Sequence, residues 1–366
     1  MNRPDHSPGI RAIDTDLTFT AALQEAAAQR FRSFLAWPVV RTAANYLRSV
    51  RHRPDWLGVR LDRRLTSAKY VLRTLCMPLQ HMRHLDFIYE NADMRAYQSR
   101  DARLLERHFH RYINLSWSRR ERLRTVRQHY RFALATLPRP LFQAIYLRGN
   151  APLGEIRLKD GSPLKIALCP PIAMGCEGEL CIQLSLADDR PVYRMVITVI
   201  DERPTLAIGC IQGPDGENSR EIVRDLTRQL HGLRPKQLLL YLAYAFARHH
   251  GIERICAISN AAHPLRRNGR KFEADYDAFW QEQKGMPVRR GWYVLPASPG
   301  RKTEAEVSSQ HRSAFRRREA LRTEAERLLA DALGQATPRH SAYASAHDPI
   351  SPRSFNNSRP EALWTS

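Results

Sequence analysis

Two cations flank a proline at the predicted start of a buried helix. The segment 231–236 has the sequence HGLRPK, and a strongly apolar run at 238–247 follows it. Proline fits the first turn of a helix, where its missing N–H costs nothing. This start places Arg234 and Lys236 beside free backbone N–H groups and the positive end of the helix dipole. We predict an anion-binding or cofactor-binding site at this turn, formed by His231, Gly232, Arg234 and Lys236.

A second group of polar residues follows the two predicted strands on either side of this turn. Gln212 comes after the first strand, and Ser259 and Asn260 come at the end of the second. Ligand crevices in such sheets form outside the carboxyl ends of strands, where a crossover begins. We therefore expect these side chains to converge with residues of the next loop and helix. The predicted ligand-binding residues are Gln212, Ser259, Asn260 and Asp275, and the predicted proton-transfer residues are His263 and Tyr276.

The sequence carries none of the compact catalytic motifs. It has no nucleophile elbow, Walker loop or HExxH motif. The six cysteines are scattered and lack the C-x₂₋₄-C pairs that zinc sites favour, so we expect free buried thiols and no metal site. A structural alternative therefore stays open for the polar residues: Asn260 would cap a turn, Tyr276 would be a core aromatic and Arg234 would be solvated.

The elements that position these residues read as a strand–helix–strand crossover. The pattern predicts a strand at 206–211, a helix at 219–230, the turn, a second helix to about His250 and a strand at 254–259. The second helix is apolar on nearly all sides, which is typical of a helix buried between a sheet and another layer. It is too short to cross a bilayer.

The periodicity of the chain changes near Gly149. Between Leu23 and Leu147 apolar residues recur at three- and four-residue spacing, which predicts helices, and afterwards the period of two predicts strands. Thr303 and Glu306 form a capping box for a long charged helix. The strands expected outside the crossover are 153–158, 163–169, 179–186, 193–201 and 292–295.

These patterns predict an α+β protein. We expect an N-terminal helical region followed by a domain with an antiparallel-led mixed sheet and flanking helices. The predicted segments are a disordered N-terminus (1–18), the helical region (19–148), the α/β domain (149–300), a charged helix (301–333) and a disordered tail (334–366).

The charge of the chain favours acidic partners. Its 58 Lys and Arg against 37 Asp and Glu give a formal net charge of +21. Nucleic acid, an anionic membrane surface and a phosphorylated small molecule all fit this balance, although an arginine-rich composition without such a partner is an open alternative. The segment 30–53 mixes aromatic and basic residues and could lie on anionic lipid or pack its apolar face inward. With no secretory signal and no run of about 18 apolar residues, we expect a cytoplasmic protein or one peripheral to the inner membrane face.

Several short stretches resemble the VirK/YbjX family of bacterial proteins. They lie in order between about residues 110 and 300, and the family is linked in general to stress, envelope or virulence functions without an assigned biochemistry. The resemblance implies a protein of this kind. The matching stretches are 128–130 (QHY), 211–213 (IQG), 231–236 (HGLRPK), 258–260 (ISN) with His263, 274–280 (ADYDAFW) and 295–297 (LPA).

The order of elements also resembles the acyl-CoA-dependent N-acetyltransferase (GNAT) fold. This resemblance implies a GNAT-like domain, acyl-CoA as the cofactor and its pyrophosphate at the start of the central helix. The usual Gln/Arg-x-x-Gly-x-Gly/Ala signature is missing, the turn has the single glycine Gly232, and an extra helix precedes it. Three classes stay open: an acyltransferase-like enzyme, a non-catalytic binder of an anionic ligand or membrane surface, and a nucleic-acid binder.

Overall fold

The computed structural model describes residues 38–51, 53–56, 60–172, 175–266 and 275–334. The chain divides into two compact units, the first ending at Asn91 and the second beginning at Ala92. The predicted helical region 19–148 spans parts of both units. Its boundaries and those of the other predicted segments stay predictions, and the two ends predicted to be disordered lie outside the described residues.

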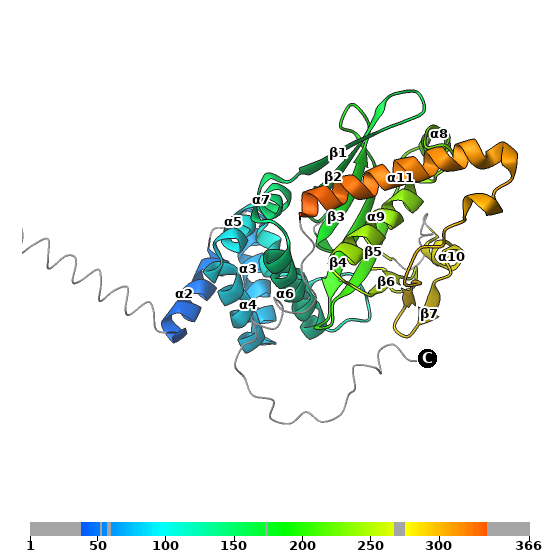
Figure 1. Cartoon of the computed structure of the whole chain (residues 1–366). Helices are drawn as coiled ribbons and strands as arrows, with labels where there is room; N and C mark the ends of the chain where they lie inside the picture. Colours follow the sequence, from blue (N-terminus) through cyan, green and yellow to red (C-terminus); the bar gives the residue numbers. More distant parts are fainter. Residues whose placement is uncertain (1–37, 52, 57–59, 173–174, 267–274, 335–366) are drawn as a thin grey trace, which may run out of the picture. The chain divides into compact units, whose positions relative to one another are not determined.

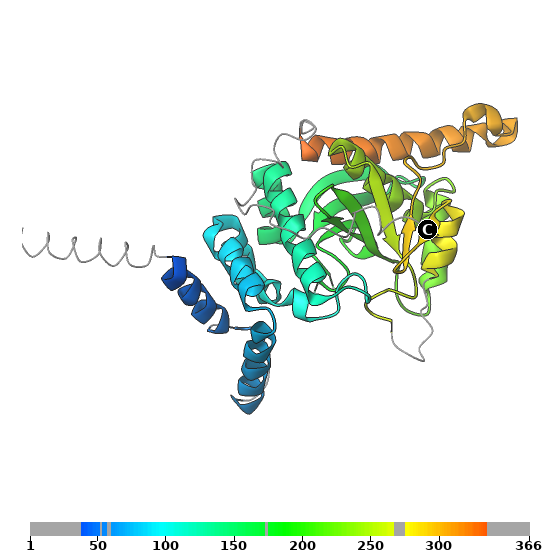
Figure 2. The same cartoon turned by 90° about the horizontal axis from the view of Figure 1, so that it is seen from below.

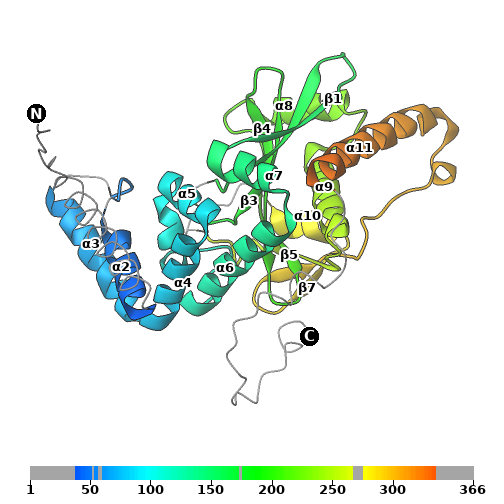
Figure 3. The ribbon, with the colours of Figure 1, turned by 60° about the vertical axis from the view of Figure 1, so that its left-hand side comes forward.

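The described part of the first unit consists of helices (Figure 3). Its described helices are α2 (Pro38–Val50), α3 (Arg60–Leu75) and α4 (Pro78–Glu90). Asp86 on α4 accepts hydrogen bonds from Thr42 (2.9 Å) and Asn45 (2.8 Å) on α2. A polar interface therefore holds these two helices together.

The second unit begins with helices that lead to a large sheet. They are α5 (Ala92–Arg100), the 3₁₀ turns η1 (Ala102–Leu105) and η2 (Arg107–Phe109), α6 (Arg119–Thr136), α7 (Arg139–Gln143) and the π-helical turn η3 (Ala144–Arg148). Helix α6 begins with a capping box, in which the Ser118 hydroxyl accepts from Glu121 N–H and the Glu121 carboxylate accepts from Ser118 N–H.

The sheet has eight strands in the order β1-β2-β3-β4-β5-β6-β8-β7 (Figure 1). The strands are β1 (Ala151–Arg157), β2 (Pro163–Cys169), β3 (Leu180–Ser185), β4 (Pro191–Ile200), β5 (Thr205–Gln212), β6 (Arg254–Ile258), β7 (Met286–Val288) and β8 (Trp292–Val294). The first five strands form an antiparallel meander, β5 and β6 pair in parallel, and β8 pairs antiparallel with both of its neighbours. The predicted fold class, helices followed by an antiparallel-led mixed sheet with flanking helices, is confirmed.

Helices α8 (Ser219–Gln229) and α9 (Pro235–His249) make the crossover between the parallel strands. Helix α9 begins at Pro235 as predicted, and its leucines at 238, 239, 240 and 242 are all buried. It packs on β4 and β6 and is covered by α11 (Arg312–Leu333), which lies across it (Figures 1 and 2). The predicted burial of this helix between a sheet and another layer is confirmed.

The QHY stretch on α6 attaches this helix to the sheet. Gln128 donates to the Asp201 carbonyl (2.7 Å), and His129 Nδ1 accepts from Val199 N–H (3.2 Å). Burial, followed by the charge of Arg107, lowers the pKa of His129 to about 3, so the ring is neutral and can accept this bond.

Two sequence predictions near the C-terminus need correction. The Thr303–Glu306 capping box is present, but it caps the short 3₁₀ turn η5 (Glu304–Glu306), because Val307 is extended and ends the turn. A second 3₁₀ turn, η6 (Ser309–His311), follows, and the long helix starts only at Arg312. The predicted last strand is the second strand of a short hairpin, whose first strand, β7, was not predicted.

Candidate functional site

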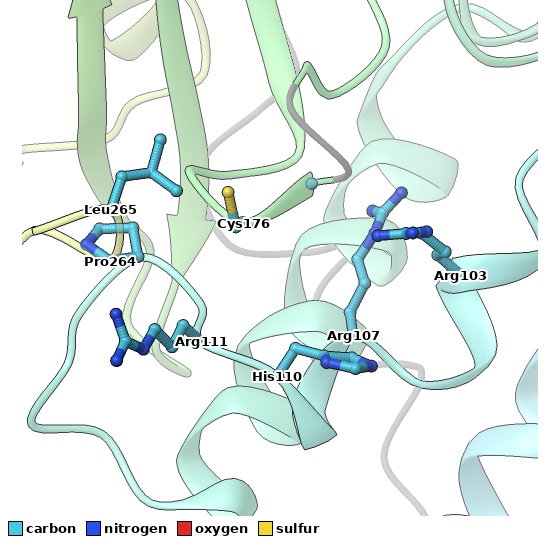
Figure 4. A pocket seen from close by; sticks show the side chains of 8 residues that line it. Arg103, Arg107, His110, Arg111, Cys176, Pro264 and Leu265 are labelled. Atoms are coloured by element: carbon cyan, nitrogen blue, oxygen red, sulfur yellow. The ribbon is translucent and has the colours of Figure 1, made fainter. Parts of the chain in front are cut away.

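A cavity of about 290 Å³ opens in the second unit between three chain segments (Figure 4). Its volume corresponds to the small end of ligand sites, which start near about 300 Å³. Figure 4 shows Arg103 and Arg107 on one side of Cys176, and Pro264 and Leu265 on the other. We call it the arginine cavity; its lining residues are Arg103, Arg107, His110, Arg111, Gly175, Cys176, Pro264 and Leu265.

Arg107 is the buried part of the cavity wall. Its guanidinium group forms ion pairs with Asp101 and Glu179, and its terminal nitrogens also donate to the hydroxyls of Tyr130 (2.9 Å) and Tyr97 (3.1 Å). Two carboxylates therefore compensate its charge, as a buried cation requires. Its Nε is buried and has no hydrogen-bond partner among the described residues.

Gly175 allows the chain to approach this guanidinium group. A Cβ atom at this position would lie 2.4 Å from Arg107 Nε, and the backbone has a φ of +73°, which favours glycine. The Gly175 backbone therefore packs directly on the guanidinium group, and a larger residue would not fit here.

The remaining cations of the cavity are closer to solvent. Arg111 and His110 are exposed, and Arg103 is half-buried. His110 lies 3.7 Å from Glu106, and Arg111 donates a long hydrogen bond (3.4 Å) to the Arg266 carbonyl. These weak contacts leave both side chains able to turn toward a bound anion.

Cys176 lines the cavity as a protonated thiol. Burial, followed by the negative charge of Glu177, raises its pKa to about 11, and the positive charges of Arg107 and Arg103 only partly offset this effect. Because the thiolate is the nucleophilic form, this residue is not activated for nucleophilic catalysis at neutral pH.

A buried polar pair lies directly behind the cavity. His263 Nε2 is 3.1 Å from Glu177 Oε1, and Gln212 donates to the other carboxylate oxygen at 3.1 Å. Leu265 N–H donates to His263 Nδ1 (3.3 Å), and Nε2 is the ring nitrogen that faces the carboxylate. Since Cys176 and Pro264 are the chain neighbours of this pair, the Glu177–His263 contact fixes two cavity segments to each other.

Backbone hydrogen bonds attach the third segment. Ile113 N–H donates to the Cys176 carbonyl (2.7 Å), and Leu115 N–H donates to the Ala262 carbonyl (2.9 Å). The three walls of the arginine cavity are therefore connected independently of any ligand.

The Tyr276 hydroxyl binds the backbone of strand β5 at a position past the residues that pair with β6. The two strands pair only as far as Ile208, and the Tyr276 hydroxyl bonds to both the N–H (3.2 Å) and the carbonyl (3.1 Å) of Ile211. Burial raises the pKa of this hydroxyl well above its usual value, so it keeps its proton at neutral pH. It lies on helix α10 (Tyr276–Glu282), with its ring 5.4 Å from that of His263 between centroids.

The basic turn, residues 231–236, is partnered by the same helix α10. Arg234 forms an ion pair with Glu282, and Lys236 Nζ lies 4.3 Å from the centroid of the Phe279 ring. Burial, followed by the charge of Arg234, lowers the pKa of Lys236. Both cations thus contact groups of the protein itself.

The backbone of the basic turn also has internal partners. The N–H groups of His231, Gly232, Leu233 and Gln237 donate to carbonyls of the chain, and Pro235 has none to donate. The turn therefore offers a CoA pyrophosphate few N–H groups, those of Arg234 and Lys236 at most, where several at one helix start are usual. The predicted anion site at this turn stays a prediction.

The structure brings together only part of the predicted site. Gln212, His263 and Tyr276 gather around Glu177 and Ile211, as described above. Asn260 accepts from Tyr276 N–H (3.0 Å) and donates to Asp275, the N-cap of α10, while the Ser259 hydroxyl accepts from Ala262 N–H (3.3 Å). His231 and Gly232 lie at the end of α8, where Arg318 packs on Gly232.

The residues that sequence reasoning missed are those of the arginine cavity. A cationic pattern was visible in the sequence at Arg103, Arg107, His110 and Arg111, but these residues lie in 3₁₀ turns and loops without a periodic signal. The stretch 176–179 (CEGE) offered a second signal, because two acids beside a glycine are unusual at the start of a buried strand. The three segments come together only through contacts distant in sequence.

The described residues contain neither a cluster of metal ligands nor a membrane-spanning helix. No three His, Cys, Asp or Glu side chains in that part of the chain are placed to hold a metal ion. No helix there is both long and apolar enough to span a bilayer.

Comparison with known proteins identifies the family. A family model described as "Protein of unknown function (DUF535)" matches residues 60–331. The chain belongs to this family. The uncharacterized protein YbjX of Escherichia coli is 29% identical over 264 residues, covering 70% of this chain and 80% of that protein, so the resemblance to the VirK/YbjX family is confirmed.

Two further relatives and one solved structure are similar to parts of the chain. An uncharacterized protein of Haemophilus influenzae is 26% identical over 269 residues, covering 73% of this chain and 89% of its own length. A protein of Mannheimia haemolytica named membrane protein LapB is 32% identical over 135 residues, covering 36% of this chain and 55% of that protein. Among solved structures, a cAMP-binding acyltransferase from Mycobacterium smegmatis matches 57% of this chain and 59% of that one, at 8% identity and a TM-score of 0.27.

Proposed function

We propose that this member of the DUF535 family binds a small anion, a phosphate or carboxylate group, in the arginine cavity. The observation that carries the proposal is the gathering of four basic side chains, Arg103, Arg107, His110 and Arg111, around one cavity of about 290 Å³. Cations that line a concave surface raise the local concentration of anions and attract them into it.

The charge of the site supports an anion over a neutral ligand. Asp101 and Glu179 compensate Arg107, so the exposed Arg111 supplies the excess positive charge. Arginine forms planar, paired hydrogen bonds with phosphate and carboxylate groups. Pro264 and Leu265 give the opposite wall an apolar surface, which suits a ligand with a short apolar part beside its anionic group.

Calorimetric titration of the full chain with inorganic phosphate, acetate and glycerol 3-phosphate tests this proposal. Arg111→Gln removes an exposed cation of the cavity and is expected to weaken binding about tenfold or more, since a hydrogen bond to a charged group contributes about 1.5–3 kcal/mol. Arg234→Gln is the matched control, because it removes the same charge from the basic turn. No response of the wild-type protein to any of the three compounds contradicts the proposal, as does a loss of binding in Arg234→Gln alone.

Acyl transfer is a second candidate, favoured by the order of strands and helices around β5 and β6. Under this reading, an extended substrate would pair with the β5 edge at Ile211, where Tyr276 now bonds. Titration with CoA in the same calorimeter separates the two candidates. Absence of CoA binding removes acyl transfer and leaves the small-anion proposal intact.

The name of one relative, membrane protein LapB, favours an envelope-related role for this chain. Roles in stress response and virulence, and binding of nucleic acid, stay predictions. Under the envelope reading, the phosphate group would come from a lipid headgroup and not from a free metabolite. Glycerol 3-phosphate that binds more tightly than inorganic phosphate would support the headgroup source, and the reverse order would support free phosphate.

A further inference from the structure

Helix α3 in the first unit carries four exposed leucines. Leu61, Leu65, Leu72 and Leu75 are between 51% and 67% exposed. With Ala68, they are spaced by four, three, four and three residues, which places them on one face of the helix. Of the eight large apolar side chains that are exposed in the described chain, six belong to the first unit, so this unit is where an apolar surface is concentrated.

The face of α3 that packs against the rest of the unit is polar. The buried Tyr70 hydroxyl contacts Ser49 (2.9 Å) on α2 and His81 (2.8 Å) on α4. Thr74 forms a hydrogen bond of 2.9 Å with the Tyr46 hydroxyl. A helix in a water-soluble bundle ordinarily buries its leucines and exposes its hydroxyls, and α3 does the opposite. The fold of the unit therefore does not depend on the leucine face.

The charges on α3 favour an anionic membrane over a second copy of the chain as the surface that covers this leucine face. Arg63, Arg64 and Lys69 are exposed, and Asp62 is the sole acid between residues 60 and 75. In a paired helix of a second copy, Arg64 and Lys69 would flank the leucine seam and face like charges, which disfavours self-association. A surface of anionic lipid accepts both the leucines and the cations.

We propose that α3 docks the first unit onto a membrane surface that contains anionic lipids. The helix lies in the interface with Leu61, Leu65, Leu72 and Leu75 in the acyl region and the cations at the headgroups. This inference is independent of the arginine cavity, which belongs to the second unit. It also names the described leucine face of α3 in place of the segment 30–53, whose residues before Pro38 lie outside the described chain.

Vesicle flotation of the full chain tests the proposal. One set of vesicles contains phosphatidylcholine alone, and the other also contains phosphatidylglycerol. The wild-type protein is expected to float with the second set and to bind it less at high salt. The double variant Leu65→Gln/Leu72→Gln is expected to lose about tenfold or more of this binding, because it removes apolar surface that enters the bilayer. Its thermal unfolding should be unchanged, since both side chains are exposed.

Two controls make the result specific. Met286→Gln changes an apolar side chain of the second unit that is 68% exposed, and it should bind vesicles like the wild type. Arg63→Gln/Arg64→Gln should reduce binding only to the anionic vesicles. Failure of the wild type to bind anionic vesicles overturns the proposal. A wild-type dimer in sedimentation velocity that Leu65→Gln/Leu72→Gln dissociates also overturns it, because the occupant of the face is then a second copy.

Discussion

The basic turn and the arginine cavity both gather cations, but they differ in what those cations contact. At the turn, Arg234 pairs with Glu282 and Lys236 lies over the Phe279 ring. In the cavity, the Arg107 guanidinium group is buried between Asp101 and Glu179, while Arg103 and the exposed Arg111 line the volume beside it. Cations at a helix start can therefore serve to dock a neighbouring helix, whereas cations that line a cavity can serve the anion binding proposed above.

The largest expected effect concerns the ion pairs of the two regions. Glu179→Gln removes a fully buried carboxylate that pairs with Arg107, and we expect it to lower the free energy of unfolding by about 3–5 kcal/mol. Glu282→Gln breaks the more exposed pair with Arg234 and should cost less than about 1 kcal/mol. Urea denaturation of both variants measures the difference. Equal losses in the free energy of unfolding would contradict the difference between a buried and an exposed ion pair.

A second prediction uses the histidines near the two regions. The folded-state pKa of His129 is about 3, below the unfolded value near 6.5, so the unfolded chain binds more protons between these values. Its contribution to stability is complete above about pH 6.5 and is lost as the pH falls, by about 1.4 kcal/mol per pH unit. His250, whose pKa burial also lowers to about 3, adds a similar slope.

Replacement of His129 by Gln should make the stability of the protein less dependent on pH between about 4 and 6.5. His231, in the basic turn, also has a lowered pKa, caused first by burial and then by Arg317, Lys159 and Arg318. Because the His231 side chain is much more accessible to solvent, His231→Gln should change the slope of stability against pH far less. Urea denaturation at several pH values compares the two variants, and a larger change in His231→Gln would contradict the burial argument.

A third prediction, smaller than the loss expected for Glu179→Gln, concerns Tyr276 on α10, the helix that also partners the basic turn. Tyr276→Phe leaves the Ile211 N–H and carbonyl without their hydroxyl partner and should cost about 1–3 kcal/mol. Tyr244→Phe is a suitable control, because its hydroxyl bonds to one carbonyl, that of Pro296. Thermal unfolding of the two variants measures the effect. A smaller loss for Tyr276→Phe would mean that water replaces the hydroxyl at the β5 edge.

The sequence predicted the crossover because its signals are local. The apolar run at 238–247 and Pro235 define a buried helix and its start, and the alternating strands define the meander. The short strand β7 escaped prediction, since it has three residues and contains Pro287. The late start of α11 was missed because a capping box specifies a first turn and not the length of the helix that follows.

The predicted site was recovered in part for the same physical reason. Gln212, His263 and Tyr276 do lie near the ends of β5 and β6, where topology places them. The arginine cavity could not be predicted, because Arg107 is 72 residues from Glu179 and none of its contacts leaves a periodic pattern. The partners of Arg234 and Lys236 could not be predicted either. The sequence shows that these residues are charged, but not which carboxylate or ring lies beside them in the fold.

The position of a bound anion tests the account most directly. Crystals of the full chain soaked in tungstate, an anomalously scattering analogue of phosphate, locate the anion without reference to activity. We predict a peak in the arginine cavity within hydrogen-bond distance of the Arg111 guanidinium group, lost in Arg111→Gln crystals. A peak at the basic turn with an empty cavity would contradict the account.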